Sequence, residues 1–281
     1  MVVWNHVSYT YYSSLKNTVL GINIPGIVWV DWGFLGVSLF IFASGAGLAH
    51  SNQMINSIEN FKDYLLKRVI RLYPAYWMSA ILSIAIVGTA TLDLSPVRII
   101  RLVSGFWVYF YGWGSDWGNN INYAYWFIGL IVILYLLYPI LDKTIRWHPH
   151  ISIVSLFIIS IICRLWVHSL AWANFDRPDT WFAPCRLFEF GLGIYIVRMG
   201  WYPRIENKSS LVVLSNLSFY VYLIHVPLIE FWAYSPYIFI LMTIILAYAI
   251  HCFDIQFRKI NPLTKKCPLV LKLADDGAKD L

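Results

Sequence analysis

The chain contains a series of long apolar segments, and no other feature of the sequence constrains its fold as strongly. Seven of them approach the length that an α-helix needs to cross the hydrocarbon core of a membrane, roughly 20 mostly apolar residues. They lie near residues 28–48, 72–92, 124–141, 151–171, 182–199, 209–232 and 236–254. Lipid offers the backbone no hydrogen-bond partners, so each segment is predicted to be helical. The sequence therefore predicts an all-α, polytopic helical bundle in a membrane.

The composition excludes a soluble globular protein. Of the 281 residues, 59% are hydrophobic and 13% are charged, whereas soluble domains carry about 25% charged residues. The formal net charge of +6 comes from lysines and arginines in short connections between apolar segments. Positive charge in such connections sets membrane topology, so we expect no nucleic-acid partner. The four cysteines form no CxxC pair, and we expect neither a disulfide framework nor a zinc site.

The basic connections predict the orientation of the chain. They lie at residues 52–71, 142–149 and 198–208 and in the tail after Asp254. All four fall on one side of the membrane only if residues 96–113 do not cross it fully. We therefore expect an interfacial or re-entrant helix at residues 96–113. The basic connections and the C-terminus are then cytoplasmic, in a multi-pass protein of the cell membrane.

Residues 1–12 (MVVWNHVSYTYY) are apolar and aromatic but too few to span a membrane. They carry no basic n-region and no cleavage site, which argues against a signal peptide. We expect them to form part of a truncated first helix, which brings the predicted number of transmembrane helices to about eight. No repeat or Pro/Gly/Ser-rich linker divides the chain. We therefore expect one transmembrane domain over residues 1–260 and a short polar, cytoplasmic tail over residues 261–281.

Polar side chains within apolar segments are costly unless they are partnered, so they are the first candidates for a functional site. His6 lies among apolar and aromatic residues, where a neutral imidazole could accept a proton from a hydroxyl group. The simpler alternative is a histidine that only packs. For His225, the simpler alternative is a histidine at the membrane interface. Arg186 and Glu189, three residues apart, are expected to pair and could also line a cavity.

The stretch FKDYLLKRVIRLYPAYW, at residues 61–77, carries the most informative charge pattern. Arg68 and Arg71 are three residues apart and share one face of a helix that is predicted to enter the membrane. Guanidinium groups form bidentate hydrogen bonds with phosphate oxygens, so this pair could hold the phosphates of a ligand. The alternative is that the two arginines only anchor the cytoplasmic end of the helix.

Residues 34–50 (FLGVSLFIFASGAGLAH) are rich in small side chains. Ala43 and Gly47, four residues apart, are predicted to let a neighbouring helix approach closely. No lysine follows the glycines, so the segment does not match a phosphate-binding loop. His148 and His150 have no carboxylate at metal-ligand spacing, and we expect no bound metal. The sequence also lacks the motifs of lipases, metalloproteases and prenyl transferases.

In their order along the chain, these features resemble the membrane-bound acyltransferase 3 family. After the early His6, four stretches are similar to family motifs: GVSLFIFASG at 36–45, KRVIRLYPAYW at 67–77, WFIGLIVILYLLYP at 126–139 and SFYVYLIHVP at 218–227. DIQFRK at residues 254–259 is similar to the end of the last helix in many members. The chain departs from the family pattern at Ser38 and Ile131, where Asp and Glu are common, and the family's arginine eleven residues before its histidine would precede Met1.

The resemblance implies an acyltransferase that moves an acyl group, often acetyl, from cytoplasmic acyl-CoA to a hydroxyl of a sugar, a lipid-linked glycan or a small metabolite. His6 would activate the acceptor hydroxyl, and Arg68 and Arg71 would hold the phosphates of the donor. Acyl-CoA would be a co-substrate, with no tightly bound cofactor. Further candidates for lining a cavity are Trp126, Arg186, Glu189 and His225.

Two alternatives to this function are open. The first is a membrane transporter or flippase that moves a glycolipid or an acyl group without catalysing the transfer. Transporters often contain inverted repeats, and the sequence has no matching halves. The second is an inactive member of the family, in keeping with the truncated first helix.

Overall fold

The computed structural model describes residues 2–3, 18–19, 22–23, 32–51, 55–87, 95–106, 109, 122–170, 178–201, 209–229 and 231–260. Contacts divide the chain into two compact units whose segments alternate along the sequence. The first unit comprises residues 1–54, 94–118 and 125–203, and the second comprises residues 55–93, 119–124 and 204–281. The predicted tail at residues 261–281 lies outside the described residues.

Five helices in the described part of the chain are long and apolar enough to cross a membrane. They are Gly33–His50, Ile58–Val87, Tyr123–Trp147, Pro149–Val167 and Pro236–Ile260. These helices confirm five of the seven predicted segments, and helices are also present in the other two. The chain is thus an all-α polytopic bundle. Two short strands, β1 (Thr18–Val19) and β2 (Ile22–Asn23), pair as an antiparallel hairpin and are a minor addition to that class.

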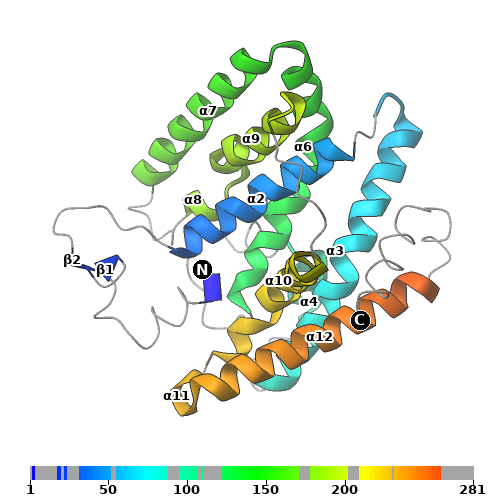
Figure 1. Cartoon of the computed structure of the whole chain (residues 1–281), viewed down its shortest axis with the longest axis vertical. Helices are drawn as coiled ribbons and strands as arrows, with labels where there is room; N and C mark the ends of the chain where they lie inside the picture. Colours follow the sequence, from blue (N-terminus) through cyan, green and yellow to red (C-terminus); the bar gives the residue numbers. More distant parts are fainter. Residues whose placement is uncertain are drawn as a thin grey trace. The chain divides into compact units, whose positions relative to one another are not determined.

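The first unit is built around the short helix α9 (Leu187–Arg198). This helix packs against α2 (Trp32–His50), α6 (Trp126–Trp147) and α7 (Pro149–Leu170), and Figure 1 shows it between α2 and α7. Apolar α9 side chains such as Phe190 are fully buried there. A 3-10 turn, η4 (Ala183–Arg186), precedes α9. The predicted segment 182–199 is therefore helical, but it is not one continuous α-helix.

Glycines bring the backbones of α2 and α9 together. A Cβ atom added to Gly45 would lie 2.2 Å from the carbonyl oxygen of Phe190, and one added to Gly193 would lie 2.1 Å from that of Phe42. A side chain at either position would collide with the opposite backbone. The absence of a side chain at both glycines therefore sets the distance between these two helices.

The small residues predicted to mediate a close helix contact are not the ones that do so. Ala43 and Gly47 are both exposed. A Cβ atom added to Gly47 would meet no other atom within 4 Å. The prediction is wrong because four-residue spacing of small residues identifies a helix face without identifying the face that a neighbour covers.

Two helices extend into segments that were predicted to be basic connections. α3 (Ile58–Val87) begins well before the predicted apolar segment 72–92, and α6 continues through most of residues 142–149. Lysine and arginine side chains at a helix end can extend toward the polar interface while their backbone remains helical. Prediction from apolar segments alone therefore makes both helices too short at these ends.

Helix α4 (Pro96–Ser104) occupies the first half of the segment predicted not to cross the membrane. It ends at Gly105, whose φ of 74° is the left-handed conformation that glycine adopts at helix ends. Nine residues of α-helix rise only about 14 Å, too little to cross the hydrocarbon core. Apart from Tyr109, residues 107–121 lie outside the described residues, and the interfacial position of this segment stays a prediction.

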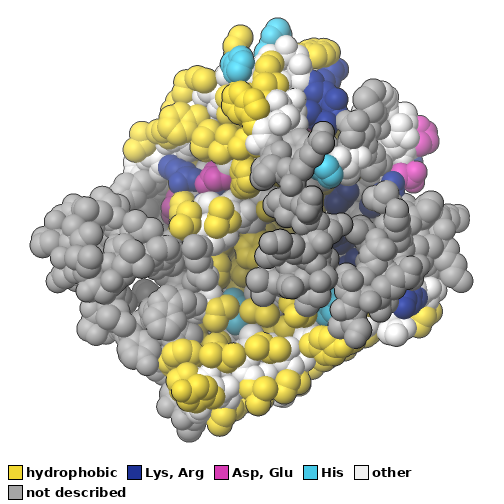
Figure 2. All heavy atoms as spheres, viewed as in Figure 1, with side chains coloured by type: hydrophobic (Ala, Val, Ile, Leu, Met, Phe, Trp, Pro, Cys, Tyr) yellow, Lys and Arg dark blue, Asp and Glu magenta, His cyan; other side chains and the backbone are white. Residues whose placement is uncertain are grey.

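The outer surface of α7 is strongly apolar. Only 17% of the residues in an apolar 18-residue stretch of this helix are buried within the structure. Its exposed side chains include Ile151, Phe157, Ile162 and Trp166. Figure 2 shows hydrophobic side chains gathered over α7 and also over α12 (Pro236–Ile260). Such surfaces are unfavourable in water and are expected on helices that contact lipid.

The second unit consists of α3, α10 (Ser209–Leu228) and α12, which pack against one another, with the short α11 (Phe231–Tyr234) beside α12. The segment before α6 is tied to α10. The amide of Asn122 donates a hydrogen bond to the carbonyl of Leu223 over 2.7 Å, and the hydroxyl of Tyr222 donates to the carbonyl of Ala124 over 2.8 Å.

Candidate functional site

The two arginines of the predicted phosphate site lie on α3 in the second unit. The guanidinium of Arg68 lies over the ring of Tyr64, 5.5 Å from its centroid, a distance typical of a cation–π contact. Its Nε atom is buried and has no hydrogen-bond partner. Arg71, one turn further along, is exposed. The helix thus presents one partly buried and one exposed guanidinium at its basic end.

A buried carboxylate on α12 organises the surroundings of this pair. Asp254 accepts a hydrogen bond from the hydroxyl of Tyr220 over 2.7 Å and pairs with Arg258 through both carboxylate oxygens. Nη2 of Arg258 also donates to the backbone carbonyl of Arg71 over 3.3 Å. Arg258 therefore connects the end of α12 to the part of α3 that carries Arg68 and Arg71.

His251 lies one turn before Asp254 on α12. Its side chain is 8% exposed, and its ring centroid lies 5.0 Å from that of Tyr220. Its Nδ1 atom is buried without a hydrogen-bond partner. The second unit thus contains a buried imidazole with an unused ring nitrogen, a group that can give or take a proton.

Of the predicted residues His6, His225 and Trp126, the structure describes the last two, which belong to different units. His6 lies outside the described residues. His225 is fully buried in the second unit, with Nδ1 2.7 Å from the carbonyl of Tyr222, and its depth in the membrane stays a prediction. Trp126 begins α6 in the first unit and packs edge-on against Phe127. A cavity-lining role for His225 and Trp126 stays a prediction.

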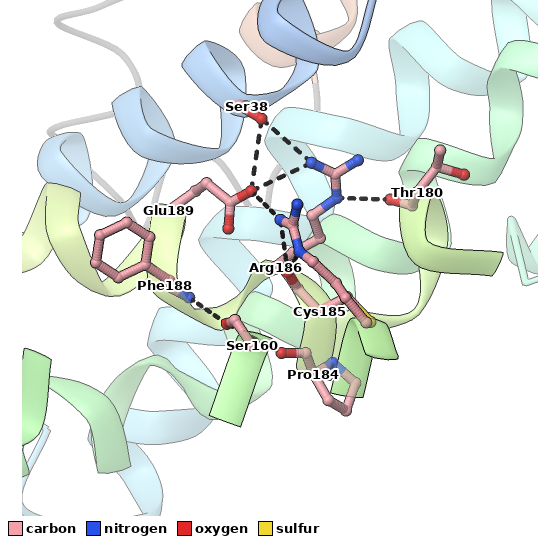
Figure 3. Close-up of polar contacts among 9 residues, drawn as sticks. Ser38, Ser160, Thr180, Pro184, Cys185, Arg186, Phe188 and Glu189 are labelled. Atoms are coloured by element: carbon pink, nitrogen blue, oxygen red, sulfur yellow. Dashed lines mark hydrogen bonds and ion pairs between the residues drawn. The ribbon is translucent and has the colours of Figure 1, made fainter. Parts of the chain in front are cut away.

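The predicted pairing of Arg186 with Glu189 is present in the first unit, as part of a larger network (Figure 3). Nη1 of Arg186 lies 3.2 Å from Oε1 of Glu189 and donates to the hydroxyl of Ser38 over 3.2 Å. Its Nε atom donates to the carbonyl of Thr180 over 2.9 Å. Nη2 of Arg164 lies 2.6 Å from the same Oε1 atom. Five helical elements, α2, α7, α8 (Pro178–Trp181), η4 and α9, thus contribute to a network around one carboxylate oxygen and two guanidinium groups.

The two arginines of this network differ in exposure and in their contacts. Arg164 is 31% exposed and also donates twice to the carbonyl of Cys185, over 3.0 and 2.9 Å. Arg186 is 0% exposed, and its guanidinium carbon lies 3.9 Å from the centroid of the Phe34 ring. Nη2 of Arg186 and Oε2 of Glu189 are buried without hydrogen-bond partners. These two polar atoms are therefore buried without a hydrogen bond. This costs free energy unless a ligand provides the missing partner.

A second ionic cluster lies at the other end of α9. Arg198, at the end of that helix, pairs with Asp142 of α6 over 2.7 Å, and Arg146 pairs with the same carboxylate over 2.9 Å. Twelve residues of α9 span about 18 Å, which separates this cluster from the Arg186 network at the opposite end of the helix.

Sequence reasoning missed several members of these clusters. Arg164 is a charged residue within a predicted membrane segment, and that signal alone could have marked it as a candidate. In the sequence, Ser38 stands out only as a departure from a family pattern. Asp254 and Arg258 stand out only as part of a motif at the end of the last helix. Nothing in the spacing of the chain joins Ser38 to Arg186, which lies 148 residues away. Among the described residues, no group of three or more His, Cys, Asp or Glu side chains is placed to hold a metal ion.

Comparison with known protein families identifies a match over most of the chain. A family model described as an acyltransferase domain matches residues 1–270 of the chain. Comparisons with curated proteins and with solved structures find no match. The matched range contains all the described residues of both units, including the arginines of α3 and the network around Arg186.

Proposed function

This chain belongs to the acyltransferase 3 family of membrane proteins, and on that basis we propose that it transfers an acyl group from acyl-CoA to a hydroxyl group. The acyl group is acetyl in the simplest case. The acceptor is a carbohydrate, a lipid-linked glycan or a small metabolite. The family match over residues 1–270 is the observation that carries this proposal.

The donor phosphates are assigned to Arg68 and Arg71. Acyl-CoA carries several phosphate charges, and guanidinium groups are the side chains best suited to bind them. The unused Nε donor of Arg68 and the exposed position of Arg71 support this assignment. Arg258 contributes by holding the end of α12 against the backbone at Arg71. The predicted cytoplasmic location of these basic helix ends places them where acyl-CoA is found.

His6 is assigned as the general base. The acceptor hydroxyl oxygen attacks the thioester carbonyl carbon while the imidazole takes the hydroxyl proton. The carbon–sulfur bond then breaks, the ester forms, and the departing thiolate of CoA takes the proton from the imidazolium. This sequence needs no metal and no oxidant. The mechanism requires that the imidazole of His6 be neutral near pH 7, as an unperturbed histidine is.

The test is acyl transfer from radiolabelled acetyl-CoA by membranes that contain the full chain. His6→Ala should lower kcat by roughly 100- to 10,000-fold while acetyl-CoA still binds, because general-base catalysis contributes about that factor. Arg68→Ala together with Arg71→Ala should raise the KM for acetyl-CoA more than it lowers kcat. Lys62→Ala, an exposed basic residue on the same helix, is the matched control and should change neither.

Two results would contradict the proposal. If His6→Ala affects only the KM for acetyl-CoA and the double arginine variant affects only kcat, the assigned roles are wrong. If membranes move a glycolipid or an acyl group while no acyl-CoA is consumed, the protein is a transporter and not a transferase.

A further inference from the structure

The guanidinium of Arg186 is held in place on three sides and has one unused end. The Thr180 carbonyl binds Nε, Ser38 and Glu189 bind Nη1, and the Phe34 ring lies against the flat face. Nη2 makes no hydrogen bond, although the side chain is 0% exposed. In Figure 3 this nitrogen lies on the far side of the guanidinium from Glu189. A fixed and buried donor without an acceptor points to a ligand oxygen at that position.

The charges around Arg186 favour an anionic oxygen. One carboxylate oxygen of Glu189 pairs with both Arg164 and Arg186. These two guanidinium groups therefore share a single paired carboxylate. Asp179 acts on Arg186 electrostatically but forms no ion pair with either arginine, and it is partly exposed. Moving an arginine out of water costs several kcal/mol unless its charge is balanced. An oxyanion at Nη2 would place a further negative charge in direct contact with Arg186, which Asp179 does not do.

The location of the network indicates which substrate would bring this anion. The Arg198–Asp142 cluster lies at the end of α9 that is followed by a basic connection, and the Arg186 network lies at the opposite end of this helix. Since basic connections are expected in the cytoplasm, the Arg186 network lies on the outer side of that cluster. Acyl-CoA enters from the cytoplasm, whereas a glycan acceptor on a surface lipid or polymer approaches from outside. Arg164, which is 31% exposed, brings the network to the surface of the unit.

We propose that Arg186 binds an oxyanion, a carboxylate or a phosphate ester, that is carried by the acceptor substrate. The proposal rests on the acyltransferase function proposed above and narrows its acceptor to acidic or phosphorylated glycans and metabolites. Arg186 fixes the anionic substituent of the acceptor through Nη2, and thereby orients the acceptor hydroxyl groups relative to the rest of the site.

The experiment measures binding without catalysis. The full chain is purified in detergent, and its thermal unfolding is followed while glucuronate, glucose 1-phosphate or glucose is added at matched ionic strength. We expect at least one of the two anionic sugars to raise Tm in a saturable manner and glucose to have no effect. Arg186→Gln should weaken binding of the anionic sugar at least tenfold. Arg146→Gln, which removes an arginine of the Arg198–Asp142 cluster, should leave it unchanged.

Three results would overturn the proposal: no stabilisation by either anionic sugar, equal stabilisation by glucose, or stabilisation that persists in Arg186→Gln. The comparison of charged with neutral sugars on the unmodified chain decides the question even if Arg186→Gln does not fold. In that case Arg186→Lys, which keeps the charge but loses the planar donor edge, should bind the anionic sugar more weakly.

The phosphate of a lipid headgroup has the same chemistry as a phosphorylated acceptor. A further experiment distinguishes the two. The chain is placed in nanodiscs of phosphatidylcholine with or without phosphatidylglycerol. If phosphatidylglycerol stabilises the chain through Arg186 and abolishes glucuronate binding, the anion belongs to lipid and the acceptor assignment is wrong. Acyl transfer to a neutral acceptor that is unaffected by Arg186→Gln would overturn this inference while leaving the acyltransferase function intact.

Discussion

Asp254 is the residue on which the order of the basic site in the second unit depends. It is fully buried and is the shared partner of Tyr220 and Arg258. Removing one member of a buried ion pair costs about 3–5 kcal/mol, because the other charge is left uncompensated. We expect Asp254→Asn to lower Tm markedly and to raise the KM for acyl-CoA, since Arg258 would no longer hold α12 to the backbone at Arg71.

Tyr220→Phe is the matched comparison, because it removes one hydrogen bond to Asp254 and keeps the ion pair. It should cost about 1 kcal/mol and leave the KM for acyl-CoA nearly unchanged. Equal losses in the two variants would show that the ion pair has no special role. Thermal unfolding in detergent and steady-state kinetics would distinguish the two outcomes.

Individual residues were predictable where the sequence itself shows an unusual environment. Arg186 and Glu189 stand out because they are charged and three apart beside an apolar helix, and their pairing is confirmed. Their partners Ser38 and Arg164 come from helices far away in sequence, and no local pattern specifies which side chain a buried charge will meet. Tertiary packing decides this, so the network could be predicted only in its local part.

At the scale of the helix, the contact between α2 and α9 depends on two glycines. A methyl group at Gly45 or Gly193 would come within 2.2 or 2.1 Å of a backbone oxygen on the other helix. Backbone atoms cannot yield without separating the helices, and overpacking of this kind typically costs about 1–3 kcal/mol or more. We therefore expect Gly193→Ala and Gly45→Ala to lower Tm and the yield of folded protein in detergent.

Gly47→Ala is the internal control for this prediction. It lies on the same helix, and an added methyl group would meet open space. Alanine also has the higher helix propensity, by about 1 kcal/mol in water, so this variant should be neutral or slightly stabilised. A loss of stability in Gly47→Ala equal to that in Gly45→Ala would show that helix propensity or lipid contact, and not the α2–α9 distance, governs the effect.

For the whole molecule, the distribution of basic residues predicts the sidedness of the first unit. With the four native cysteines replaced, a single cysteine at His148, between α6 and α7, should be protected from a membrane-impermeant maleimide in intact cells. A cysteine at Asp179, at the opposite end, should react. Reaction of His148→Cys and protection of Asp179→Cys would reverse the orientation and would move the Arg186 network to the cytoplasmic face.

The membrane class and the positions of most helices follow from apolar segment length, because lipid leaves the backbone few alternatives to a helix. The ends of α3 and α6 were misjudged because charged side chains occur on helices that still belong to the membrane-embedded structure. The division of the chain into two units was not predictable, since no linker or change in composition marks it. The division arises from which helices contact one another. The pattern of residues along one sequence contains little information about such contacts.

The alternation of the two units along the chain constrains the order of biosynthesis. Helix α3 is made early, but its packing partners α10 and α12 belong to the last part of the chain. During translation α3 is therefore made before α10 and α12, the helices against which it packs within the second unit. A nascent chain halted after residue 203 would contain every segment of the first unit but would lack α10 and α12, so the second unit could form only after the first was complete in sequence.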